Sequence, residues 1–122
     1  MKGFKTCLCM IMAVLLLLSA CGYGKQKLPE VEKLSELSGE ELVDYLVALG
    51  LKIPEGCNVP EDNIRMIQGF VGELEKDPNY MYVTNMRWYH ILFLRTKVVV
   101  SKFYGNEEIA KTTQEMLNEI EK

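Results

Sequence analysis

The chain has 122 residues, of which 48% are apolar and 25% charged, so it has room for a single domain. A net charge of −3 at pH 7 and the lack of a continuous Lys/Arg stripe disfavour nucleic-acid binding, which relies on neutralising phosphates. One His, sparse Cys and no Gly-rich phosphate loop leave few routes to catalysis, so we expect a non-enzymatic protein with no metal and no cofactor.

The N-terminal residues have the order of an export signal. Lys2 and Lys5 precede an unbroken apolar stretch from Cys7 to Leu18, and small residues close the segment. A membrane-spanning helix needs about 20 predominantly apolar residues, and the strongly apolar part here is shorter. We therefore predict a cleaved signal peptide over residues 1–20.

The signal ends in Leu18-Ser19-Ala20-Cys21. This tetrapeptide resembles the lipobox of bacterial lipoproteins, in which a Leu, two small residues and a Cys direct lipid transfer to the thiol and cleavage before it. The resemblance covers residues 1–21 and implies that Cys21 becomes a diacylglyceryl-modified N-terminus, with Ala20 lost at the cut. Two acyl chains anchor a protein firmly. The expected location is the outer face of the bacterial cytoplasmic membrane, or an outer membrane if the host has one.

A short tether would join this anchor to the rest of the chain. Residues 21–27 comprise the lipidated Cys and six residues with no apolar pattern. A flexible chain of six residues spans roughly 13 Å, and at most about 20 Å when extended, so the domain would lie close to the bilayer. Cleavage and acylation would leave Cys57 as the only free thiol, and its surroundings in sequence favour buried packing over redox chemistry.

Residues 28–122 are predicted to form one helical domain, and its first long helix has a marked start. The tetrapeptide 38–41 is an S-x-x-E capping box, and Leu37 and Leu42 occupy the positions of a hydrophobic staple. Upstream, apolar residues spaced by three permit a short lead-in helix after Pro29.

The same helix has an equally marked end. Gly50 offers the left-handed conformation that closes helices, and Leu51 can fold back on Leu46 as in a Schellman ending. We therefore predict a helix over residues 39–49. A loop bracketed by two prolines follows, and Pro60 is well placed as the first residue of the next helix.

An apolar stripe predicts that this second helix runs from Pro60 until Asp77-Pro78 stops the pattern. Gly69 and Gly72 lie inside it, although each costs about 1 kcal/mol relative to Ala. We attribute the two glycines to close packing against another helix.

The segment 85–104 favours strands by propensity, because it is rich in aromatic and β-branched residues. At 100° per residue, however, its five basic residues fall within one sector about 160° wide, whereas strand alternation would divide them between two faces. Gly105 then offers a helix end, so we predict a helix here, preceded by a short extended piece at residues 80–83. Asn106 can cap a last helix that reaches the C-terminus. The predicted fold is all-α, a small bundle of about four helices.

Two sets of residues on the helix predicted over 85–104 are candidate sites. The basic sector is a candidate interaction face: Arg87, His90, Arg95, Lys97 and Lys102. Aromatic residues form a candidate apolar pocket: Trp88, Tyr89, Phe93 and Phe103. The helix carries +4 in a domain whose residues 30–77 carry −8. We weigh an outward face for anionic headgroups or an acidic partner against internal pairing with the first two helices, and hypothesise internal pairing.

Two functions fit these features. The first is a membrane-anchored surface lipoprotein acting as a small helical protein-interaction or accessory module, such as an immunity factor, with a protein partner at the membrane surface. The second is a lipoprotein that binds a small amphiphilic ligand or lipid between its helices. An apolar cavity of about 300 Å³ or more favours the ligand. A filled core with an exposed apolar or basic patch favours the module.

Overall fold

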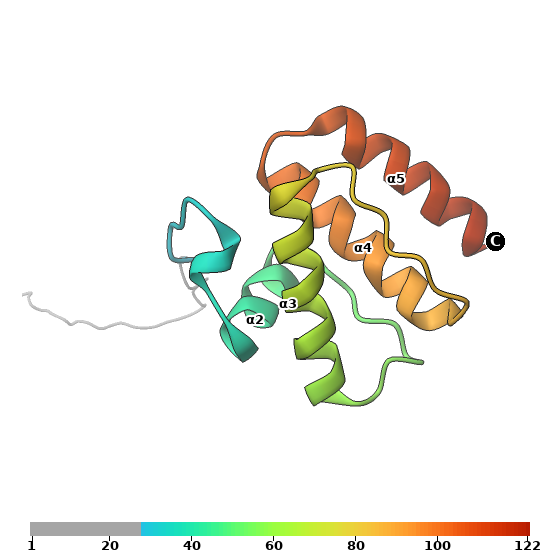
Figure 1. Ribbon diagram of the computed structural model, residues 1–122, viewed down its shortest axis with the longest axis horizontal. Coiled ribbons are helices and arrows are strands. Elements are labelled where there is room, and N and C mark those ends of the chain that lie inside the picture. Colours follow the sequence, from blue (N-terminus) through green and yellow to red (C-terminus); the bar gives the residue numbers. More distant parts are fainter. Residues whose placement is uncertain (1–27) are drawn as a thin grey trace, which may run out of the picture.

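The computed structural model describes residues 28–122, so the predicted signal peptide, Cys21 and the tether lie outside the described residues. Within them the chain forms a 3-10 helix and four α-helices, and no strand is present in this range. These are η2 (Leu34–Glu36), α2 (Gly39–Ala48), α3 (Pro60–Lys76), α4 (Arg87–Phe103) and α5 (Glu107–Ile120). The predicted all-α fold with four helices is confirmed (Figure 1).

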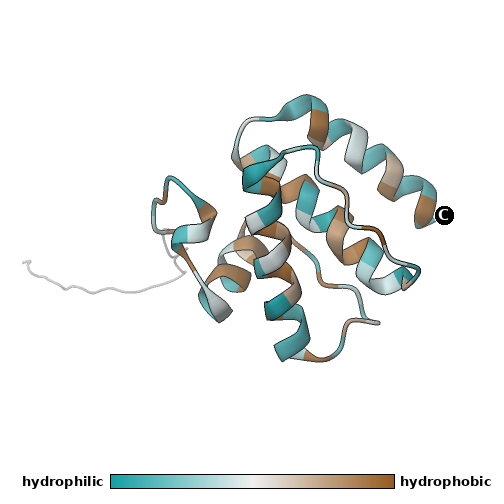
Figure 2. Ribbon diagram, viewed as in Figure 1, coloured by the Kyte–Doolittle hydropathy of each residue, from teal (hydrophilic) through white to brown (hydrophobic). Residues whose placement is uncertain are grey.

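The helix α4 is the centre of the bundle and contacts α2, α3 and α5. A three-residue connection makes α4 and α5 antiparallel neighbours, while α3 crosses α4 on the side that faces the viewer in Figure 1. Hydrophobic and hydrophilic residues alternate along α5 in Figure 2, as expected for a helix with one buried side. No helix in residues 28–122 combines the length and the apolar content that a bilayer crossing requires.

The core is filled rather than hollow. Four consecutive residues of α4, 91–94, are each at most 2% exposed, so α4 is buried around much of its circumference. Phe93 packs edge-on against the rings of Phe70 and Tyr80, at centroid distances of 5.0 and 5.7 Å. Burying one such side chain stabilises the fold by roughly 1.5–3 kcal/mol, so this cluster holds α3 and α4 together.

Glycines end two of the helices in the predicted way. Gly50 and Gly105 have φ angles of 119° and 76°, a region that favours glycine. The N–H of Leu51 donates to the Leu46 carbonyl at 2.9 Å, which is the long hydrogen bond of a Schellman ending. The predicted ending of α2 is therefore confirmed.

The predicted N-terminal caps are absent from the structure. Ser38 and Asn106 precede α2 and α5 as predicted, but neither side chain forms a capping hydrogen bond. Gly39 has a φ of 61°, outside the right-handed helical region that a capping box needs at the first helical position. Asn106 has a ψ of 71°, away from the extended conformation typical of a cap.

The explanation of the two glycines inside α3 is wrong. A Cβ at Gly69 or Gly72 would meet no neighbouring atom within 4 Å, so no other helix packs against either position. Nothing in the structure explains why these residues are glycine.

Candidate functional site

A groove of about 610 Å³ lies where the C-terminal end of α2 and the chain that follows it face α4 and α5. Three separate segments of the sequence form its walls, so the groove exists only in the folded domain. Its lining mixes apolar and charged side chains, and those that bear on its chemistry are Lys52, Arg95, Val99, Lys102, Phe103 and Glu121.

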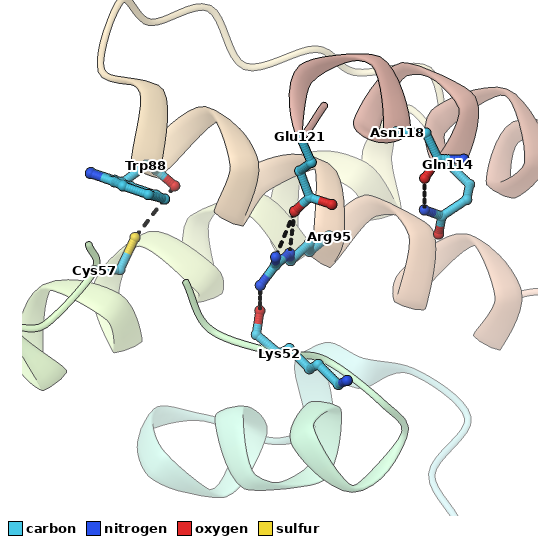
Figure 3. Close-up of polar contacts among 7 residues, drawn as sticks. All are labelled: Lys52, Cys57, Trp88, Arg95, Gln114, Asn118 and Glu121. Atoms are coloured by element: carbon cyan, nitrogen blue, oxygen red, sulfur yellow. Dashed lines mark hydrogen bonds and ion pairs between the residues drawn. The ribbon is translucent and has the colours of Figure 1, made fainter. Parts of the chain in front are cut away.

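Arg95 joins the three walls of this groove (Figure 3). Its Nη1 donates to the backbone carbonyl of Lys52 at 2.8 Å, and its Nε donates to Oε2 of Glu121 at 3.1 Å. The Arg95 and Glu121 side chains are about one-third exposed, so their ion pair contributes about 0–1 kcal/mol. Arg95 therefore fixes the shape of the groove, and Glu121 compensates its charge.

Lys102, like Lys52, is a basic group of the groove without an ion-pair partner among the described residues. Lys102 is exposed. Val99 and Phe103 line the groove beside it, three residues and one residue away along α4. The groove thus offers a free positive charge next to an apolar strip.

The predicted basic face is divided by the fold. Arg95 and Lys102 line the groove, whereas Arg87 is exposed at the start of α4. His90 is half-buried, and its Nε2 has no hydrogen-bond partner within the described chain. Lys97 is only 4% exposed and therefore belongs to no surface.

Lys97 is buried because the extended chain between α3 and α4 passes over it. Its Nζ donates to the carbonyl of Tyr80 at 3.0 Å. Burial lowers the pKa of Lys97, and Asp77 opposes this shift. The hypothesised pairing with the acidic faces of the first two helices is not found among the described residues. Arg95 instead pairs with Glu121, just after α5, and Lys97 donates to a backbone carbonyl.

The four aromatic residues of the predicted pocket do not line one cavity. Phe93 is in the core, Tyr89 is half-buried, Trp88 is exposed at the start of α4, and Phe103 alone lines the groove. Trp88 and Phe103 lie roughly 22 Å apart along the helix, because an α-helix rises 1.5 Å per residue. The prediction was based on helical periodicity, which shows that these residues lie on the same side of the helix but not how far apart they lie along its axis.

Sequence reasoning missed a polar cluster that holds the N-terminal segment. The Tyr104 hydroxyl donates to Glu75 and accepts a hydrogen bond from the N–H of Leu34 at 2.9 Å. Burial and the Glu75 hydrogen bond raise the pKa of Tyr104 to about 12. Burial alone would raise the pKa of Glu75, but hydrogen bonds from Tyr104 and Ser35 outweigh it and lower that pKa. These residues are far apart in sequence, and no local pattern connects them.

Cys57 is buried, as predicted, in the loop that precedes α3. Its Sγ donates to the Trp88 carbonyl at 3.4 Å (Figure 3). Burial raises the pKa of the Cys57 thiol, against the opposing effect of Arg95. Because the thiolate is the reactive form, this thiol is a weak nucleophile.

Known proteins offer no guide to this site. Comparison with protein-family models, with curated proteins and with solved structures finds no match for this chain. Within residues 28–122, no group of three His, Cys, Asp or Glu side chains is arranged to hold a metal ion.

Proposed function

We propose that this chain is a membrane-anchored bacterial surface lipoprotein whose helical domain is a protein-interaction or accessory module. The main observation in support of an interaction module is the groove between α2, α4 and α5. The lipobox Leu18-Ser19-Ala20-Cys21 supports the anchor. In this role the domain holds or blocks a protein partner at the membrane surface, as an immunity factor does, and needs no catalytic group.

The shape and lining of the groove favour a protein segment over a small molecule. Ligand pockets are lined mostly by apolar side chains and enclose most of the ligand. This groove is partly open to solvent and has charged residues on each wall, while Phe93 and its neighbours fill the space between the helices. A fitting partner segment presents apolar side chains to Val99 and Phe103 and a carboxylate to Lys102.

The volume of the groove favours one further candidate. At about 610 Å³ it lies within the roughly 300–1,000 Å³ typical of ligand sites, so a small amphiphile with an acidic head could occupy it. Such a ligand would use the same Lys102 and Phe103, and mass spectrometry of the intact protein under native conditions would detect it.

Site-specific crosslinking in the native membrane tests the module. A photo-crosslinking amino acid replaces Lys102 in one variant and Lys111 in a matched control, because both lysines are exposed but only Lys102 lines the groove. We expect a defined protein adduct from position 102 and none from position 111.

Charge reversal provides the second arm of this test. Lys102→Glu should abolish recovery of the same partner, whereas Lys111→Glu should leave it unchanged. Equal recovery from the two variants would contradict a partner in the groove, and a bound small molecule in place of a protein adduct would favour the ligand.

A further inference from the structure

Residues 78–86, here called the strap, follow Asp77 and lead from α3 to α4 without a single charged side chain. The strap runs across α4 in Figure 1 as the yellow segment between the two helices. Its alternate residues point inward: the Tyr82 ring packs on Phe70 at a centroid distance of 4.9 Å, and the Tyr80 ring packs on Phe93. The strap is therefore held against the core from one side.

The other side of the strap and the first turn of α4 expose apolar residues. Val83 is 88% exposed, and three more large apolar side chains are exposed within five residues of it. We call these four residues the tip: Met81, Val83, Met86 and Trp88. Exposed apolar residues are ordinary when they are scattered singly, whereas here four occur within eight residues of the chain.

The tip is rigidly supported at Trp88. A Cβ at Gly56 would lie 2.2 Å from Trp88 Cγ, so the indole ring packs directly over the glycine backbone. The hydrogen bond from Cys57 Sγ to the Trp88 carbonyl joins the same loop to the start of α4. Trp88 thus keeps almost half of its surface exposed while the loop fixes its position.

The segment that forms the tip carries positive charge and no acid, and Glu55, which adjoins Gly56, is the one acidic residue of the supporting loop between α2 and α3. No Asp or Glu occurs between Asp77 and Glu107, whereas residues 30–77 carry −8. Arg87 is exposed, and its guanidinium carbon lies 5.6 Å from the centroid of the Trp88 ring. A basic residue beside exposed Trp, Met and Val is the composition of a segment that lies at a membrane interface, where the headgroups are polar and the acyl chains apolar.

We propose that the tip contacts a lipid bilayer, with Val83, Met86 and Trp88 entering the boundary between headgroups and acyl chains and Arg87 meeting an anionic headgroup. This inference rests on the proposed anchor, whose tether of at most about 20 Å holds the domain next to the bilayer. In Figure 1 the described chain begins at the opposite end of the molecule from the junction of the strap with α4, so the tip reaches the lipid when the domain lies along the membrane surface. The tip then decides which face turns toward the lipid.

Trp88 is the only tryptophan of the chain and therefore reports on the tip without labelling. The full, lipidated protein is reconstituted into vesicles of mixed zwitterionic and anionic lipids with bromine on the acyl chains. We expect Trp88 emission to shift to shorter wavelength and to be quenched by the brominated lipids. Replacing the anionic lipids by zwitterionic ones should weaken the quenching, because Arg87 then loses its headgroup partner.

Two charge variants at exposed valines control this measurement. Val83→Glu should remove both the shift and the quenching, whereas Val47→Glu, at a valine on α2 that is 47% exposed, should leave both intact. Unchanged Trp88 emission on reconstitution, or equal quenching in the two variants, would overturn the inference. So would a blue shift that depends on protein concentration without lipid, because it would assign the tip to a second copy of the chain. Flotation of the protein with the vesicles tests the anchor separately, because flotation depends on the lipid at Cys21 and not on the tip.

Discussion

Gly56→Ala is the substitution whose effect follows most directly from the geometry. A Cβ at this position would lie 2.2 Å from Cγ and 2.3 Å from Cδ1 of Trp88. Carbon atoms attract one another at separations of about 3.5–4.0 Å, so the indole ring has to move. Forcing an additional methyl into such a contact costs about 1–3 kcal/mol of unfolding free energy. In a domain of this size each kcal/mol lowers the Tm by about 4–8 °C.

Thermal unfolding followed by circular dichroism measures this cost, and Trp88 fluorescence shows whether the ring has moved. Gly69→Ala and Gly72→Ala are the matched controls, because a Cβ there meets no neighbouring atom and Ala favours a helix. Each control should raise stability by up to about 1 kcal/mol. A Gly56→Ala variant with an unchanged or higher Tm and unaltered Trp88 emission would refute the packing of Trp88 on the loop.

Two further predictions concern polar contacts between distant segments. Arg95→Gln should destabilise the domain more than Glu121→Gln, because it also removes the hydrogen bond to the Lys52 carbonyl, which is worth about 0.5–1.5 kcal/mol; equal costs in urea unfolding would contradict this. Tyr104 has a folded pKa of about 12, above its ordinary value of 10.0, so its contribution is present below pH 10 and is lost as the pH rises toward 12. Tyr104→Phe should lack this loss, and parallel stability curves between pH 10 and 12 would exclude the contribution.

Local signals in the sequence predicted the helices and their C-terminal ends. Gly50 and Gly105 end helices because the backbone conformation at a Schellman ending favours glycine, a requirement that depends on few neighbouring residues. The helix at α4 was predicted correctly against strand propensity because its basic residues repeat with helical period. The capping box failed because Gly39 adopts a positive φ, a backbone conformation that the S-x-x-E spacing does not encode.

The candidate site was predictable only in part. The basic sector contains Arg95 and Lys102, which do line the groove, but it also contains Lys97, which the strap covers. Neither the path of the strap nor the approach of α5 to α2 leaves a signal at helical spacing. The hydrogen bond between Tyr104 and Glu75 was missed because it joins α3 to the end of α4, and no local sequence pattern connects the two residues.

The claim that lipid on Cys21 holds this domain at a membrane is tested most directly by metabolic labelling with a radioactive or clickable fatty acid. The full chain should incorporate the label and fractionate with membranes. Cys21→Ala should lose the label and remain uncleaved or be shed, because the lipobox provides no other acceptor thiol. Cys57→Ala is the matched control and should label normally, since its thiol is buried in the folded domain. Undiminished fatty-acid incorporation into Cys21→Ala would contradict the proposed anchor.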